Sequence, residues 1–412
     1  MIKCSSITER KRKRQQHTKK SLKYSRALCI SALIGLTSPT VYGANTEFTG
    51  ATDNNWLTPD NWSHGLPNAI DRAMINSSII SDSDVTLTTD AGVTLPAKLS
   101  VGFSADGSLT IQGSSFTSAI SNIELGSKSN ITGAIHITDS ASFISSGTID
   151  IGKASNATGS IDITDSSFTS TGIVDLAKGS NATGTINITD SSFNTNGMVN
   201  IGKASNSTGR IVLHSGNMTG DQYRIAAGGN SMGSLHINSG TVTLTDELRL
   251  GAGWQSQGQL TLEQGQLSVT SLSIGHSSEA RGHLVLNGGS LTATRLDLGR
   301  AANSVVKVEL NGGVLQIDTL ASVGSVNENT EVNNYEQVTI KDGILRIKQE
   351  SRTTFNQLLV NNSLDWLSST SYLDHTEQSA ETMKIKRGTN DALFIRDDDD
   401  GYFTVWSATI QN

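Results

Sequence analysis

Apolar residues recur along the chain in one short pattern: apolar, any residue, apolar, glycine. The segment Ile149-Asp150-Ile151-Gly152 is typical, and two copies carry Ala in place of Gly. The second apolar residues lie 24 to 26 positions apart, at residues 101, 125, 151, 176, 201, 225, 250, 274 and 298. A fixed period of this length indicates a stacked repeat protein, so the repeat is the main guide to the fold.

A second pattern keeps the same period. Gly-x-apolar-x-apolar begins at glycines such as Gly133, Gly159 and Gly184, and one further apolar residue lies between the two patterns in most units. Each unit therefore contains about three short strands with alternating side chains. Such strands bury their apolar face only by stacking in parallel on the next unit. The single apolar residues form a predicted interior ladder: Phe116, Phe143, Phe168, Phe193, Met218, Val242, Leu267 and Leu291.

This pattern predicts an all-β fold, a right-handed parallel β-solenoid (β-helix) of about nine to ten coils of 24–26 residues. The units are too short for the blades of a β-propeller. We expect the coils over residues 81–325, an N-terminal cap over residues 44–80 with Trp56 and Trp62, and a C-terminal cap over residues 326–412. Caps are expected because an open end of a stack invites edge-to-edge aggregation.

Within the C-terminal cap the pattern predicts mixed short strands. Residues 338–347 read as one hairpin, residues 355–367 as a short helix, and residues 397–406 as a final strand pair around Gly401.

The first 43 residues differ in composition from the rest. Basic residues fill the start, an apolar run follows from Ala27 to Leu36, and small residues surround Gly43 and Ala44. This order is typical of a secretory signal peptide, and the apolar run is too short to span a bilayer. A basic tail that binds nucleic acid is the alternative. The leader predicts a secreted, extracellular or cell-surface protein, with the periplasm as a further location.

Charge and cysteine content narrow the function. The chain carries a net charge of −7, and residues 1–43 hold ten Lys/Arg and one Glu, which leaves −16 for residues 44–412. A nucleic-acid or anionic-membrane role is therefore disfavoured for that part. Cys4 and Cys29 both lie in the leader, so the mature chain is expected to have no disulfide, thiol catalysis or cysteine metal site.

Stacking converts the sequence period into rows of equivalent side chains. Two charged rows are candidate ligand contacts: Lys153, Lys178 and Lys203, and, within a repeated Thr-Asp-Ser, Asp139, Asp165 and Asp190. Such rows could contact an acidic glycan or cations, and calcium prefers clustered carboxylate and carbonyl oxygens. The structural alternative is that Asp occupies turns and that surface Lys discourages edge-to-edge association. No cofactor is expected, with calcium as the open alternative.

Other polar and aromatic positions follow the same period. Tyr223 occupies the position of Leu248 and is predicted to pack inside. Trp254 lies in a turn and is the candidate for an exposed ring that stacks on a sugar. One Asn in each of four units opens Asn-x-Thr-Gly, which predicts a stacked turn or, in a eukaryote, a glycosylation site: Asn130, Asn156, Asn181 and Asn206.

Three segments carry a family resemblance. The stretch from Trp56 through Asn61-Trp62-Ser63 to Gly65-Leu-Pro67 resembles the mature N-terminus of secreted bacterial β-solenoid repeat proteins. Gly282-His-Leu-Val-Leu-Asn-Gly-Gly-Ser-Leu is similar to repeats of those proteins and of autotransporter passenger domains. The segment 398–406 is similar to the tail before a PEP-CTERM-type sorting anchor, although no Pro-Glu-Pro motif or apolar anchor follows it. The resemblance implies a surface repeat protein and leaves its attachment open.

The expected function is a secreted structural or adhesive β-solenoid that contacts glycans, a cell surface or extracellular matrix through many equivalent sites. The alternative is a glycan-binding module or a polysaccharide lyase or hydrolase. No nucleophile elbow, phosphate loop or histidine metal spacing is present in the sequence. The carboxylates recur with the repeat, so we expect no enzyme.

Overall fold

The structure is a computed structural model, and it describes residues 43–76, 84–88, 95–113, 120–323, 335–360, 363–366, 375–378, 382–387 and 391–409. Residues 42–412 form one compact unit. The predicted leader over residues 1–43 lies almost wholly outside the described residues, as do Cys4, Cys29 and Phe116. None of the described helices is long and apolar enough to cross a bilayer.

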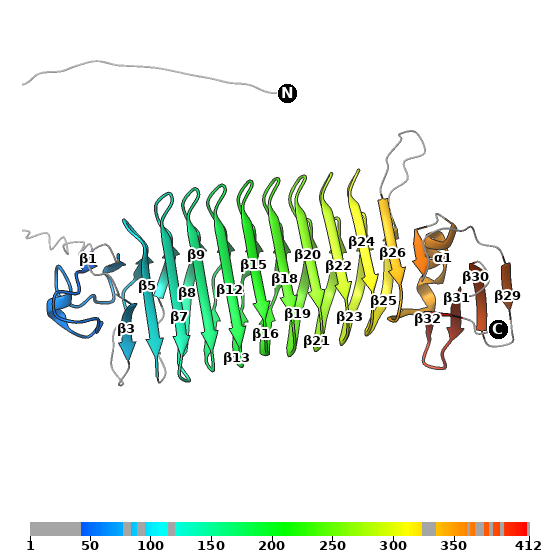
Figure 1. The fold of residues 1–412 in the computed structure, drawn as a ribbon, viewed down its shortest axis with the longest axis horizontal. Coiled ribbons are helices and arrows are strands. Elements are labelled where there is room, and N and C mark those ends of the chain that lie inside the picture. The colour runs from blue at the N-terminus through cyan, green and yellow to red at the C-terminus, as the bar shows by residue number, and fades with distance from the viewer. Residues whose placement is uncertain are drawn as a thin grey trace, which may run out of the picture. The chain divides into compact units, whose positions relative to one another are not determined.

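The described part of the chain contains two sheets, one short α-helix and short 3-10 turns (Figure 1). The 20-stranded sheet contains β1 (Asn45–Phe48), β2 (Arg72–Ile75), β4 (Lys98–Val101), β6 (Ile120–Leu125), β8 (Ser142–Ile151), β10 (Ser167–Ser170), β11 (Val174–Leu176), β13 (Ser191–Thr195), β14 (Met198–Ile201), β16 (Gly216–Gly220), β17 (Gln222–Ile225), β19 (Thr241–Leu250), β21 (Gln266–Ile274), β23 (Ser290–Leu298), β25 (Val314–Val323), β27 (Ile344–Lys348), β29 (His375–Gln378), β30 (Thr382–Arg387), β31 (Asp391–Asp397) and β32 (Tyr402–Thr409).

The 12-stranded sheet contains β3 (Asp84–Thr88), β5 (Gly107–Gln112), β7 (Thr132–Thr138), β9 (Thr158–Thr164), β12 (Thr183–Thr189), β15 (Thr208–Leu213), β18 (Met232–Ile237), β20 (Gln257–Leu262), β22 (Arg281–Leu286), β24 (Val305–Leu310), β26 (Tyr335–Ile340) and β28 (Leu364–Trp366). The helical elements are η1 (Pro59–Asn61), η3 (Gln349–Ser351) and α1 (Arg352–Val360).

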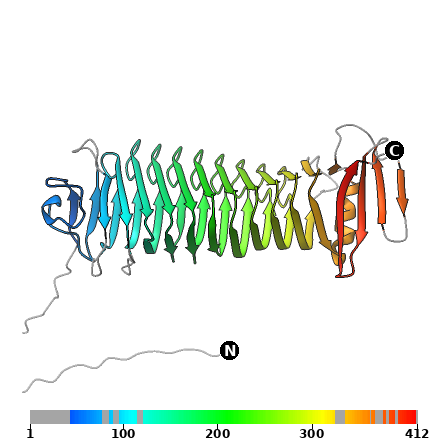
Figure 2. The ribbon, with the colours of Figure 1, turned by 60° about the horizontal axis from the view of Figure 1, so that its bottom comes forward.

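Equivalent strands of successive coils pair in parallel and in register. In the 12-stranded sheet, Gly159 lies opposite Gly184, which lies opposite Gly209 one coil further on. The predicted parallel β-solenoid is confirmed, with about 11 turns in place of nine to ten. The additional turns lie outside the glycine pattern, because β1 pairs with β2 before it begins and β26 pairs with β28 after it ends. Figure 2 shows the same stack turned about its long axis.

The interior consists of the predicted apolar ladders. Phe143, Phe168 and Phe193 stack in successive coils with ring centroids 5.4 and 5.7 Å apart, and the ladder continues through buried Met218 and Val242. Tyr223 is fully buried, as predicted, and its hydroxyl lies 3.2 Å from Thr195 Oγ1. Burial raises the pKa of this phenol well above its usual value.

At one corner of most coils a glycine approaches closely to a second glycine, or to Ala177 or Ala226 in two coils. A Cβ added to Gly159 would lie 2.3 Å from the backbone N of Gly152, a distance that no other residue tolerates without backbone movement. We call this close approach the neck. Residues 153–157 form the turn beyond the neck, so the glycines determine where Lys153 and its equivalents stand.

The C-terminal region departs from the sequence prediction in two elements. Residues 338–347 form no hairpin, because β26 continues the 12-stranded sheet and β27 continues the 20-stranded sheet. The helix covers Arg352–Val360 rather than residues 355–367, and β28 follows it as a further solenoid strand. The strand pair around Gly401 is present as antiparallel β31 and β32. Strand β32 also pairs antiparallel with β27, which ends the parallel pairing there.

Candidate functional site

One row of polar residues runs along the 20-stranded sheet at the middle position of each apolar-x-apolar-Gly unit. These residues are in register from coil to coil, and we call them the charged ladder: Ser100, Glu124, Asp150, Asp175, Asn200, Arg224, Arg249, Ser273 and Asp297. Their neighbours in sequence belong to the apolar core, so these side chains project from the opposite face of the strand.

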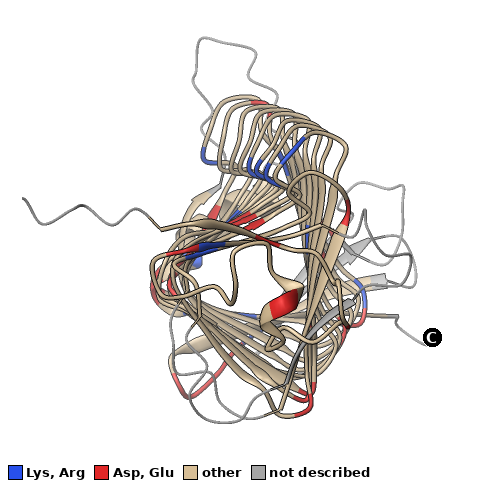
Figure 3. Cartoon of the chain, turned by 90° about the vertical axis from the view of Figure 1, so that its left-hand side faces the viewer, with Lys and Arg blue, Asp and Glu red and all other residues tan. Residues whose placement is uncertain are grey.

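The charged ladder is shielded although it does not belong to the apolar core. Glu124, Asp175 and Asn200 are each less than 5% exposed. The turn beyond the neck supplies Lys153 and Lys178 to the same side of the coil, where they reach the ladder carboxylates. Figure 3 shows Lys and Arg positions close to Asp and Glu positions on this side.

Glu124 is the most heavily paired residue of the ladder. Its carboxylate lies 3.0 Å from Arg72 Nη2 and 2.6 Å from Lys98 Nζ, and it also contacts Lys153. Burial opposes ionisation of Glu124, but hydrogen bonds from Lys153 and Lys98 outweigh it and hold the pKa of the carboxyl below its usual value. This group is therefore a buried anion at neutral pH.

Asp150 and Asp175 share Lys178 in the next two coils. Lys178 Nζ contacts Asp175 and lies 3.5 Å from Asp150 Oδ1, and Asn200 Nδ2 donates to Asp175 Oδ1 at 2.7 Å. Burial, together with the neighbouring Asp175 and Glu124, raises the pKa of the Asp150 carboxyl despite Lys178. Two adjacent carboxyls with different environments are one arrangement that acid–base chemistry uses.

The predicted lysine row is thus largely neutralised by acids of the charged ladder. Lys153 pairs with Glu124 and Lys178 pairs with Asp175. Within the described ranges, Lys203 has no carboxylate within 4.0 Å, because Asn200 replaces the acid in its coil. The charged ladder as a whole is not among the sequence-based expectations. A period count at the middle position of each unit would have found it.

The predicted aspartate row lies at a different corner, after the strands of the 12-stranded sheet. Asp139, Asp165 and Asp190 all have positive φ, between 49° and 59°, as Asp in a left-handed turn position does. Serine hydroxyls accept from the backbone of the preceding coil: Ser166 Oγ from Ala141 N at 3.2 Å and Ser191 Oγ from Ser166 N at 3.0 Å.

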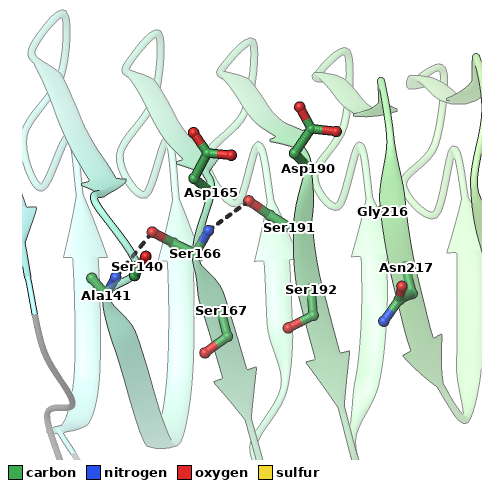
Figure 4. A pocket seen from close by; sticks show the side chains of 10 residues that line it. All are labelled: Ser140, Ala141, Asp165, Ser166, Ser167, Asp190, Ser191, Ser192, Gly216 and Asn217. Atoms are coloured by element: carbon green, nitrogen blue, oxygen red, sulfur yellow. Dashed lines mark hydrogen bonds between the residues drawn. The ribbon is translucent and has the colours of Figure 1, made fainter.

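An open depression of about 420 Å³ lies over these serines, and Figure 4 shows that Asp165 and Asp190 direct their carboxylates away from the serine hydroxyls. Among the described residues, no group of three or more His, Cys, Asp or Glu stands close enough to hold a metal ion. The observed contacts of this row are those of a stacked turn. The four Asn of Asn-x-Thr-Gly likewise have φ between 55° and 62°.

Trp254 lies in the turn beyond the neck and is 52% exposed. Its backbone O accepts from Asn230 N of the preceding coil at 3.0 Å. The ring atom Cε3 lies 4.0 Å from the point where a Cβ on Gly229 would stand, so the ring rests beside a residue without a side chain. The lysine row and Trp254 therefore lie in the same turn of different coils, whereas the aspartate row lies at another corner.

The fold and its ladders define a parallel β-solenoid repeat protein. Comparison with known proteins identifies no relative, since no protein family, no curated protein and no solved structure matches this chain.

Proposed function

We propose that this protein is a secreted structural or adhesive β-solenoid that contacts a cell surface or extracellular matrix through repeated side-chain rows. The observation that supports the proposal is the strict register of outward positions. Thr158, Thr183 and Thr208, for example, occupy one position in three successive coils. Weak contacts repeated at coil spacing, about 4.8 Å, add to useful avidity without any single strong site.

Export is the first part of the proposal to test. The full chain is expressed in a Gram-negative host, and the protein recovered from each cell fraction is weighed by mass spectrometry. Loss of the leader next to Ala44, together with recovery outside the cytoplasm, is expected. A full-length product confined to the cytoplasm would contradict the proposal.

Multivalency is tested on the exported protein with immobilised bacterial cells and matrix polysaccharide. One, two and three Thr→Ala changes are made in the row Thr158, Thr183, Thr208, and a parallel Ser→Ala series is made at Ser142, Ser167 and Ser192, an in-register row of the other sheet. A loss of binding that grows with each change in at least one row is expected. Complete loss from a single change, or no binding at all, would contradict multivalent contact.

A glycan-binding or polysaccharide-active protein is the alternative. Trp254 favours it, because an exposed aromatic ring can stack on a sugar, and burial raises the pKa of the Asp150 carboxyl, which is next to a second carboxyl in the ladder. Assay of the exported protein on a polysaccharide panel decides between the two. We expect no cleavage, and turnover that disappears in Asp150→Asn would replace the structural role with an enzymatic one.

A further inference from the structure

The charged ladder changes sign along its length. Glu124, Asp150 and Asp175 are followed by the neutral Asn200, and the next two coils place Arg224 and Arg249 side by side in register. Lysines close to the three acids neutralise them, whereas fewer carboxylates lie close to Arg224 and Arg249. We call Arg224, Arg249, His276 and Arg300 the cationic cluster.

Among the described residues, Glu247 is the only carboxylate within 4.0 Å of a member of the cationic cluster. Its Oε2 lies 2.5 Å from Arg249 Nη2, and its Oε1 lies 4.0 Å from His276 Nδ1. Arg224 and Arg300 have no carboxylate within 4.0 Å among the described residues. Arg224 interacts electrostatically with Glu247, and both arginines lower the pKa of His276. Three guanidinium groups therefore surround one carboxylate.

Two guanidinium donors in this cluster are buried without a hydrogen-bond partner. These atoms are Nε of Arg224 and Nε of Arg249 in adjacent coils, and Oδ1 of Asn200 beside them is also unpartnered. A buried donor without an acceptor costs free energy that a protein ordinarily avoids. Here the cost falls on two Arg side chains at in-register positions of adjacent coils, and a planar guanidinium fork matches the oxygens of a carboxylate or sulfate.

The electrostatics of neighbouring groups agree with a shortage of negative charge. Burial and the adjacent Arg249 lower the pKa of Arg224. Burial, Arg249, Arg300 and Arg224 lower the pKa of His276 to about 4 against the opposing effect of Glu247, so its imidazole is neutral at pH 7. Its Nδ1 lies 3.0 Å from Ser273 Oγ.

We propose that the cationic cluster binds the carboxylate or sulfate groups of an acidic polysaccharide. The cluster runs along the solenoid axis through successive coils, and Lys203 extends it one coil further, so a linear chain with an acidic group at intervals fits it. The charge of −16 on residues 44–412 opposes every polyanion at long range, so binding depends on the local cluster, and single-stranded DNA enters the test as the competing polyanion. This inference rests on the proposed function and specifies the class of ligand that the protein contacts.

The test compares four polymers on the full exported chain by biolayer interferometry: polygalacturonate, dextran sulfate, neutral dextran and single-stranded DNA. The variants are Arg224→Gln and Arg300→Gln, with Arg210→Gln as the control, since Arg210 is exposed on the 12-stranded sheet and loses the same charge. We expect the first two variants to lose about tenfold or more in affinity for the acidic polysaccharides, and the control to change by less than about twofold. Neutral dextran should not bind.

Three results overturn the proposal: no binding of either acidic polysaccharide, an equal loss in the Arg210 control, or DNA binding as tight as polysaccharide binding. Preference between polygalacturonate and dextran sulfate identifies the acidic group. A second measurement needs no variant: NMR titration of His276 should show its pKa rise when dextran sulfate is added, because the bound anion favours the imidazolium. An unchanged His276 titration under saturating ligand places the anion elsewhere and overturns the site.

The site and the proposed function fail separately. Loss of cell and matrix binding with intact dextran sulfate binding contradicts the adhesive role and leaves the cluster in place. Retained cell binding in Arg224→Gln with lost dextran sulfate binding leaves adhesion in place and shows that adhesion uses other rows.

Discussion

The Glu124→Gln substitution tests how the charged ladder is stabilised. It keeps the size of the side chain and removes the anion that faces Arg72, Lys98 and Lys153. Breaking a buried ion pair by removing one partner costs about 3–5 kcal/mol. We take the lower end, about 3 kcal/mol, because the three cations keep 22 to 34% of their side-chain exposure and water can solvate them. With a urea dependence of about 3 kcal/mol per M, the unfolding midpoint should fall by about 1 M.

The direction of the Glu124 pKa shift determines how the stability difference between wild type and variant depends on pH. The folded-state pKa of Glu124 is lowered from 4.5, so its contribution to stability is fully present above pH 4.5 and is lost as the pH falls through the lowered pKa. Protonated Glu124 resembles the glutamine, so the gap between wild type and variant should narrow as the pH falls below 4.5 and through the lowered pKa.

Urea unfolding followed by far-UV circular dichroism, at pH 7 and at a pH well below 4.5, measures this difference in unfolding midpoint. Glu279→Gln is the control, because Glu279 is exposed and its hydrogen-bond partner is the uncharged Gln255. Equal midpoints for wild type and Glu124→Gln at pH 7 would refute the reasoning. A gap that persists unchanged at low pH would refute the electrostatic explanation and indicate a packing effect instead.

Four further substitutions test the core and the neck. Phe168→Ala removes the middle ring of a buried stack and should lower the free energy of unfolding by about 3–5 kcal/mol; a loss below about 1 kcal/mol in urea unfolding would contradict tight stacking. Gly184→Ala places a Cβ 2.4 Å from a backbone N and should destabilise by more than about 2 kcal/mol, whereas Gly229→Ala, with 3.8 Å of space, should change stability by less than about 0.5 kcal/mol. Similar thermal midpoints for the two glycine variants would show that the neck is not close-packed. Tyr223→Phe removes the contact between the phenol and the buried Thr195 hydroxyl, which still donates to Thr219 O, and should cost about 1 kcal/mol in the same urea assay; a more stable variant would contradict that hydrogen bond.

Much of the fold was predictable because a solenoid repeats one local unit of strands and turns. The period of 24–26 residues and the alternation in each strand determined which residues face inward, as the buried ladders of Phe168 and Tyr223 confirm. The Asn and Asp of the turns were predictable for the same reason, since their left-handed conformations depend on local backbone geometry.

The ends were less predictable, because they depart from the repeat. The two strands near residues 338–347 resemble a hairpin in sequence, yet each extends a different sheet. Short strands with a turn between them are equally compatible with a hairpin and with a solenoid corner. Only the neighbouring coil, which offers an unpaired edge to each strand, decides between the two.

The sequence by itself determined the repeat, the interior ladders and the position of each turn. The tertiary structure decided which charges meet. Glu124 contacts residues 72, 98 and 153. Arg72 and Lys98 are in register on neighbouring coils and Lys153 lies in a turn, so no local pattern pairs them with Glu124. The neck brings the lysine turns to the shielded ladder, and the folded stack leaves Nε of Arg224 and Nε of Arg249 buried without a partner among the described residues. Local periodicity gives shape, whereas charge compensation depends on distances across coils that only the folded stack defines.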